Sequence, residues 1–234
     1  MRRTLGGFLV LAAALLVGAC QPQPKGAAPA ALPPDHAGAT LYTIDGAASM
    51  VTVRVYRDGP LARFGHNHVI GLRQLQGRVF VHRQLARSGF ELKAPLAALA
   101  VDQPADRLAA GPDFPGELPA EAIAGTRANM LGPKLLAADQ FPLLELTALA
   151  VRGALPDLIF KVDVSVGGHH SEVEFPAHVA IEGQRLRADG ALTLSQRQIG
   201  LTPFSVLGGG LRVRDELEIL YHLEATRAGS SNGP

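Results

Sequence analysis

The sequence predicts a mainly β protein: an antiparallel, eight-stranded up-and-down β-barrel with a short helical insertion. Most of the chain beyond residue 40 alternates apolar and polar residues with the two-residue period of strands that bury one face. The links between these runs are short, as at Gly167–Gly168 and Gly183–Gln184, which favours hairpins. Closing such a sheet into a barrel leaves no unpaired edge, and a β-sandwich is the alternative.

The strand pattern is clearest in two runs. Val51, Val53 and Val55 alternate with polar or aromatic neighbours, and from residue 172 to 182 the apolar side chains share one face while Glu172 and Glu174 lie on the other. The runs predicted to be strands are 49–56, 78–83, 90–99, 144–151, 158–166, 172–182, 185–194 and 212–224.

The region between Pro104 and Pro142 has a different composition. Turn-forming residues come first, and Pro119 then stands at an expected helix start, followed by alanine-rich sequence up to Leu131. Gly132–Pro133 would end that helix. One helix, with room for a second short turn, is therefore predicted as an insertion between strands.

The N-terminus predicts export. Arg2 and Arg3 precede an apolar run over residues 5–17, which is too short to span a bilayer that needs about 20 apolar residues, so residues 1–19 are interpreted as a signal peptide. Gly18 and Ala19, directly before Cys20, resemble the lipobox of bacterial lipoproteins, which implies cleavage before Cys20 and its acylation. The alternative is an ordinary signal peptide with an unmodified Cys20.

Composition predicts the domain boundaries and limits the classes of binding partner. Residues 20–40 are predicted to be an acylated N-terminus and a Pro/Ala-rich tether, residues 41–228 one barrel domain, and residues 229–234 a disordered tail. Loss of Arg2 and Arg3 would change the net charge from +1 to −1, so nucleic acid is not an expected partner. Gln21 after the anchor favours the outer membrane on the periplasmic side of a bacterial envelope.

Several segments resemble the YceI-like polyisoprenoid-binding family. They are Leu41–Asp45 at the start, Asn129–Gly132 with Gln140–Leu146 around the helix end, and Ser195–Leu201 with Val213–Leu217 near the close. The resemblance implies a lipocalin-like barrel that holds a polyisoprenoid or other long-chain lipid in an apolar lumen. The chain departs from the family at 64–70, Phe-Gly-His-Asn-His-Val-Ile, where many members carry a Gly-Phe turn.

The ligand-binding candidates are two histidines and two tyrosines. His66 and His68 are two residues apart, so on an extended segment they share a face and could contact a ligand head or, as an alternative, bind metal as part of a redox accessory protein. Such a metal site needs a third ligand from distant sequence, and none of the other histidines has a recognised zinc spacing. Tyr42 and Tyr221 could line the lumen or simply pack.

No enzymatic activity is predicted. The sequence lacks G-x-S-x-G, G-x-G-x-x-G and a P-loop, and its one cysteine would be consumed by lipid, so no catalytic residue and no cofactor are expected. A lipid-binding barrel is therefore the leading hypothesis. Its second alternative is a structural envelope module whose barrel is filled by its own side chains.

Overall fold

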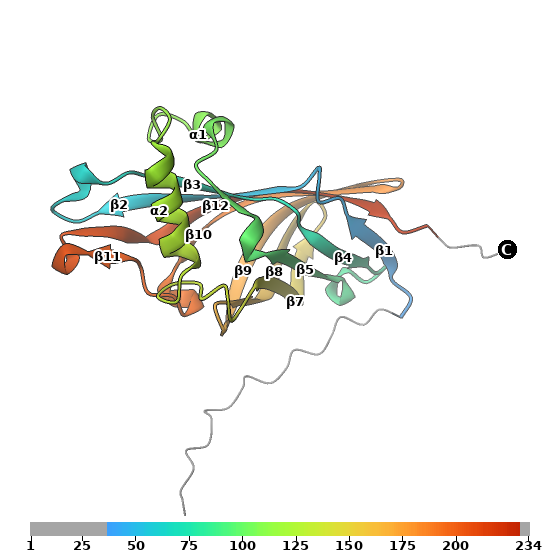
Figure 1. Ribbon diagram of the computed structural model, residues 1–234. Coiled ribbons are helices and arrows are strands. Elements are labelled where there is room, and N and C mark those ends of the chain that lie inside the picture. The colour runs from blue at the N-terminus through green and yellow to red at the C-terminus, as the bar shows by residue number, and fades with distance from the viewer. Residues whose placement is uncertain (1–36, 230–234) are drawn as a thin grey trace, which may run out of the picture. The chain divides into compact units, whose positions relative to one another are not determined.

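The computed structural model describes residues 37–229, so the predicted signal peptide, Cys20 and most of the predicted tether lie outside the described residues. The strands are β1 (Thr40–Ile44), β2 (Met50–Asp58), β3 (His68–Leu72), β4 (Gln76–Val81), β5 (Gly89–Pro95), β6 (Leu99–Val101), β7 (Leu143–Ala154), β8 (Asp157–Val166), β9 (His169–Glu182), β10 (Arg185–Ser195), β11 (Ser205–Val206) and β12 (Leu211–Arg227). The helices are α1 (Pro104–Ala110) and α2 (Ala120–Leu131) (Figure 1).

The strands form one antiparallel sheet that closes into an eight-stranded barrel. One edge of β12 pairs with β10, and its other edge pairs with both β2 and β1, so β1 and β2 act as a single strand interrupted at residues 45–49. In the same way β3 pairs with β2 and β4 pairs with β1, so β3 and β4 together form the next strand of the barrel. β6 pairs with β3 and β5 pairs with β4, and these two form the strand after that. The predicted up-and-down lipocalin-like barrel is thus confirmed, and the sandwich alternative is wrong.

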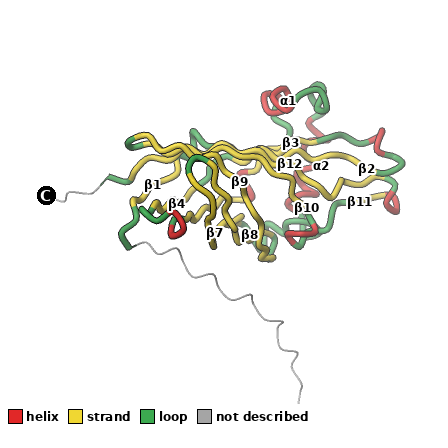
Figure 2. The backbone as a smooth tube through the Cα atoms, turned by 180° about the vertical axis from the view of Figure 1, so that it is seen from behind, coloured by secondary structure: helices red, strands yellow, loops and turns green. Residues whose placement is uncertain are grey.

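Strand alternation decides which side chains face inward. In β9, Val173, Ala177 and Val179 are buried, whereas Glu172 and Glu174 are exposed, as the two-residue period predicts. Both glycine-containing links, at 167–168 and 183–184, form tight hairpin turns. Figure 2 shows the strands running together as one continuous layer that curves on itself.

The helical insertion follows the prediction closely. Pro119 caps α2, which ends before Gly132, and its residues Ile123, Met130 and Leu131 pack on the core. The expected second short turn is α1, which begins at Pro104. No helix among residues 37–229 is long and apolar enough to cross a membrane.

One strand prediction is wrong, and strand β3 was not predicted. The run 90–99 is not one strand, because a 3-10 turn at Leu96–Ala98 separates β5 from β6. At that turn the Leu96 amide donates to the carbonyl of Pro142, and the Leu96 side chain is buried. Sequence reasoning also missed β3, at residues 68–72, whose sequence His-Val-Ile-Gly-Leu has no clear alternation.

Candidate functional site

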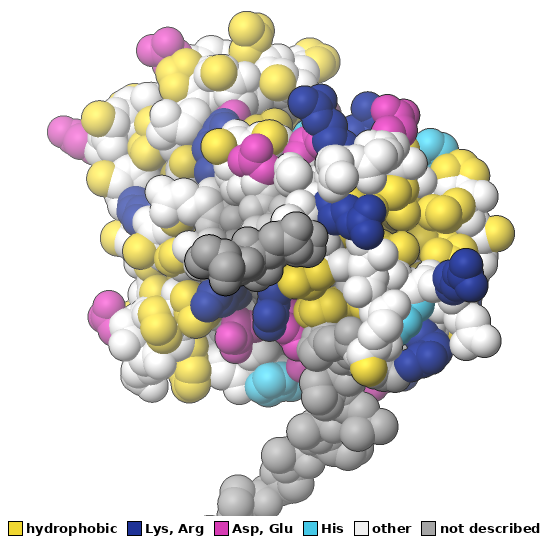
Figure 3. All heavy atoms as spheres, turned by 90° about the vertical axis from the view of Figure 1, so that its right-hand side faces the viewer, with side chains coloured by type: hydrophobic (Ala, Val, Ile, Leu, Met, Phe, Trp, Pro, Cys, Tyr) yellow, Lys and Arg dark blue, Asp and Glu magenta, His cyan; other side chains and the backbone are white. Residues whose placement is uncertain are grey.

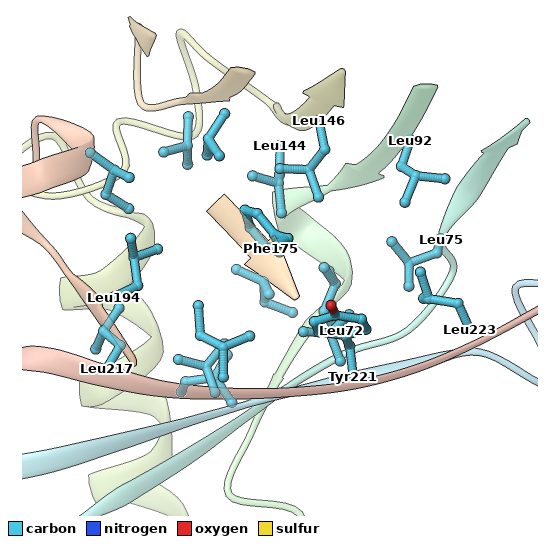
Figure 4. A pocket seen from close by; sticks show the side chains of 18 of the residues that line it. Leu72, Leu75, Leu92, Leu144, Leu146, Phe175, Leu194, Leu217, Tyr221 and Leu223 are labelled. Atoms are coloured by element: carbon cyan, nitrogen blue, oxygen red, sulfur yellow. The ribbon is translucent and has the colours of Figure 1, made fainter. Parts of the chain in front are cut away.

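The barrel encloses a cavity of about 420 Å³. Its wall is overwhelmingly apolar and comes from nearly every strand of the barrel, together with α2. Figure 4 shows leucine, phenylalanine and tyrosine side chains converging from opposite walls on an open centre. The labelled lining residues are Leu72, Leu75, Leu92, Leu144, Leu146, Phe175, Leu194, Leu217, Tyr221 and Leu223.

The interior is not filled by side chains. Val53, Val55 and Val79 line the cavity and are only half-buried. An eight-stranded barrel is just wide enough to be either solid or hollow, so side-chain volume decides between the two. The alternative of a barrel filled by its own side chains is therefore not supported.

The two candidate tyrosines lie in different surroundings. Tyr221 lines the cavity, and its hydroxyl donates a hydrogen bond to the Pro176 carbonyl. Burial, with a smaller effect from the Asp189 carboxylate, raises the pKa of Tyr221 to about 12, so the phenol is neutral at any physiological pH. Tyr42 is buried in the apolar core and is not among the cavity-lining residues.

The two candidate histidines meet at the cavity wall. His66 and His68 both line it, with their ring centroids 6.3 Å apart in an edge-on arrangement. Partial burial, followed by the nearby charges of His68 and Arg57, holds the pKa of His66 below its usual range. His66 is therefore neutral at pH 7 and can accept or donate one hydrogen bond at each ring nitrogen.

The buried ion pair between Asp102 and Arg107 orients His68. Nδ1 of His68 lies 2.6 Å from Oδ2 of Asp102, whose Oδ1 accepts hydrogen bonds from the Val69 amide at 2.9 Å and from Arg107 Nη1 at 2.7 Å. Asp102 and Arg107 are each only 2% exposed. Although burial raises the pKa of Asp102, its hydrogen bonds with His68 and Val69 outweigh burial, so the pKa stays below its usual range.

Arg107 in turn ties this pair to the loop before α2. Its guanidinium donates to the carbonyls of Asn67 at 2.9 Å, Pro115 at 3.1 Å and Gly116 at 2.9 Å, so each of its three nitrogens has a hydrogen-bond partner. Sequence reasoning missed Asp102 and Arg107, since neither stands at a recognisable spacing from His68. Their burial in a short helix and its preceding turn becomes visible only in the fold.

The orientation of His68 sets what its other nitrogen can do. Because the Asp102 carboxylate accepts, Nδ1 carries a proton and donates to it, which leaves Nε2 as the ring nitrogen that faces the cavity side. Nε2 lies 3.5 Å from Oγ1 of Thr126 on α2, which also lines the cavity. Together with Asn129 and Arg57, these groups make one end of an otherwise apolar cavity polar.

The metal alternative finds no third ligand. Among residues 37–229 no group of three or more His, Cys, Asp or Glu side chains is placed to hold a metal ion. Three of the remaining histidines pair with carboxylates away from the cavity: His170 with Asp163 at 3.0 Å, His178 with Asp157 at 2.9 Å and His222 with Asp189 at 2.6 Å. Residues 66 and 68 therefore lack the distant partner that a metal site needs.

The fold is similar to that of YceI-like proteins of known structure. BcnA of Burkholderia cenocepacia matches with a TM-score of 0.56 at 16% identity, over 78% of this chain and 99% of that chain. A polyisoprenoid-binding domain from Saccharophagus degradans matches with a TM-score of 0.52 at 11% identity, over 80% of this chain and 98% of that chain. A mutant YCEI protein of Campylobacter jejuni matches with a TM-score of 0.51 at 7% identity, over 68% and 85% of the two chains.

The chain therefore has the YceI-like fold, as the sequence resemblance implied. The sequence itself matches no family model and no curated protein. At these identities the likeness extends to the barrel, while the binding site has to be judged from the residues of this chain.

Proposed function

We propose that this protein binds a polyisoprenoid or similar single-chain amphiphile, with the chain in the barrel cavity and the polar head beside His66 and His68. The observation that carries the proposal is the cavity itself, about 420 Å³ in volume with an apolar wall and one polar end. Small-molecule sites typically have volumes of about 300–1,000 Å³ and a few placed polar groups. A structurally similar domain is described as polyisoprenoid-binding, which supports this choice of ligand.

The polar end favours a head that can form a hydrogen bond. Nε2 of His68 is available for that bond, and Asp102 holds the ring in place through Nδ1. The hydroxyl oxygen of Thr126, Oγ1, lies 3.5 Å from Nε2 of the His68 ring. This distance is longer than a normal hydrogen bond, so His68 is not placed to activate Thr126 as a nucleophile. The proposed role is therefore binding and transport or storage, without catalysis.

The proposed location is the periplasmic side of a bacterial envelope, with the outer membrane as the site of a lipid anchor at Cys20. This part of the proposal is supported by the order of residues 2–20, in which two arginines, an apolar run and small residues lead to the cysteine.

The decisive experiment is analysis of the ligand that the protein carries. The protein is purified from its native envelope, native mass spectrometry gives the mass of the complex, and organic extraction followed by lipid analysis identifies what was bound. We expect one chain-like lipid per protein. Repeated extraction without any lipid, together with failure to take up an added prenyl alcohol, would contradict the proposed function.

A further inference from the structure

One end of the barrel carries a group of exposed apolar side chains, here called the tip, which consists of Phe64, Val206 and Leu207. Phe64 is 65% exposed, Leu207 73% and Val206 37%. The tip is formed by the loop after β2 and the loop before β12, which lie together at the left end in Figure 1. A hydrogen bond of 2.8 Å from the Leu61 amide to the Gly210 carbonyl joins the two loops.

The tip holds its apolar side chains in water at an energetic cost. Leu207 has a φ of +54°, a left-handed conformation that is strained for a residue with a Cβ, and its side chain is nevertheless the most exposed of the three. The following residues, Gly208 and Gly209, also have positive φ, and no atom lies within 4 Å of a Cβ built on either. The loop therefore leaves Leu207 largely exposed to solvent.

Basic residues outnumber acidic ones around the tip. The segments 57–66 and 204–214 contain four arginines and one acidic residue, Asp58, while Asp113 and Glu218 lie beside Arg57 and Arg214. The guanidinium of Arg63 lies 4.7 Å from the Phe64 ring centroid, and Arg212 pairs with Asp58 at 2.8 Å. At the opposite end of the barrel, which faces the viewer in Figure 3, basic and acidic side chains are scattered among each other.

The cavity reaches the tip. Gly65, next to Phe64, lines the cavity, as do Leu211 and Arg212, which follow the glycine-rich loop. The apolar tip and the polar end of the cavity are therefore parts of one region of the molecule. A chain-like ligand that entered here would pass directly from the surroundings of Phe64 and Leu207 into the lumen.

We propose that the tip is a membrane-docking surface, in which Phe64, Val206 and Leu207 enter the boundary between headgroups and acyl chains of a bilayer that contains anionic lipid. Exposed apolar side chains bordered by arginines fit this boundary, because the apolar groups leave water and the cations meet anionic headgroups. The tip would bring the cavity entrance to the lipid phase independently of any acyl chains on Cys20. The inference concerns access to the site, and it does not depend on which lipid the cavity holds.

The sequence has no tryptophan, so a single introduced indole reports directly on insertion. The probe is Phe64→Trp in the full chain, mixed with vesicles of phosphatidylcholine and phosphatidylglycerol that carry bromine on their acyl chains. We expect a blue shift and quenching of the fluorescence of Phe64→Trp. The matched control is Leu108→Trp on α1, where the native leucine is 85% exposed, and it should show neither change, since α1 lies at the top in Figure 1, away from the tip.

Charge is tested in the same assay. Adding Arg63→Ser to the probe chain should raise the lipid concentration for half-maximal quenching about fivefold, since one arginine near an anionic surface contributes about 1 kcal/mol. Arg83→Ser, which removes an exposed arginine after β4, should leave that lipid concentration unchanged.

The proposal is overturned if Phe64→Trp is not quenched, or if the Leu108→Trp control is quenched equally. Circular dichroism of each variant establishes that it is folded, and ligand retention, measured separately, shows whether the lumen still binds lipid.

Discussion

His68 and Asp102 are 34 residues apart in the sequence, yet Nδ1 of His68 lies 2.6 Å from Oδ2 of Asp102 at the wall of the barrel cavity. The carboxylate is fully buried and is held by Arg107 on its other oxygen, so the imidazole is fixed in position with Nδ1 donating to Asp102. A largely apolar cavity thereby gains one oriented hydrogen-bonding nitrogen, Nε2 of His68.

Replacing the buried carboxylate should destabilise the fold. In Asp102→Ala the Arg107 guanidinium stays buried without its charge partner, and removal of one member of a buried ion pair costs about 3–5 kcal/mol. Urea unfolding measures the loss. Asp163→Ala, which removes a partner of the exposed His170, should cost less than about 1 kcal/mol. Equal losses in the two variants would show that Asp102 has no special structural role.

The same carboxylate should make the fold sensitive to acid. The pKa of Asp102 is lower in the folded protein than in the unfolded chain, where it is about 3.9, so unfolding takes up a proton as the pH falls. Its stabilising contribution is complete above the unfolded pKa and is lost as the pH drops through the folded pKa. The free energy of unfolding, measured from pH 7 to pH 2, should fall less steeply in Asp102→Asn than in the native chain. Some slope will persist, since the pKa values of Asp58 and Asp215 are also lowered.

Filling the lumen should expel the ligand. Ile219 and Leu220 are neighbours on β12, but Ile219 lines the cavity and Leu220 does not. Ile219→Trp should therefore reduce the lipid recovered on extraction, whereas Leu220→Trp should retain it. Both variants are compared at equal folded fraction by circular dichroism. Undiminished lipid in Ile219→Trp would place the ligand elsewhere.

The two histidines should affect binding modestly. If each makes one hydrogen bond with the ligand head, His66→Ala and His68→Ala should each weaken retention by about 0.5–1.5 kcal/mol, while His178→Ala on the outer face should have no effect. Competition with a fluorescent prenyl alcohol measures the affinity. NMR titration should also place the pKa of His66 below 6.5. Normal affinity in a variant that carries both His66→Ala and His68→Ala would show that neither histidine contacts the ligand.

The proposed anchor is tested at Cys20, which lies outside the described residues. Cys20→Ser removes the sulfur that carries the thioether lipid, so the variant should fail to incorporate labelled fatty acid and should no longer fractionate with detergent in the native manner. Intact-mass analysis measures the acyl addition. A Cys20→Ser chain that is still processed before residue 20 and still acylated would contradict the anchor.

The sequence predicts those parts of the fold that depend on local pattern. β9 can be predicted because its two faces differ in polarity over eleven residues, and α2 can be predicted because Pro119 and Gly132 mark its ends. β3 cannot be predicted from its own composition, because its pairing with β2 and β6 makes it a strand. Hydrogen bonds to neighbouring strands override weak local preference there.

The candidate site was predictable only in part. The spacing of His66 and His68 indicated that they share a face, and both line the cavity. The contribution of Asp102 depends on tertiary contacts over 34 residues and left no sequence signal. Whether the barrel is hollow follows from the summed volumes of side chains on all eight strands, which no single segment reveals.

The pairing of β12 has a consequence for how the molecule forms. Its last residues pair with β1, where Tyr42 is opposite Arg227, so the seam of the barrel joins segments that are among the most distant in the domain. Contacts of such long sequence separation form slowly, because the entropy of a very long loop has to be lost first. The seam cannot form during synthesis before the C-terminal strand has emerged. Until then the lumen has no wall on one side, and a chain that lacked residues 211–227 would leave one edge of β10 and one edge of β1 unpaired.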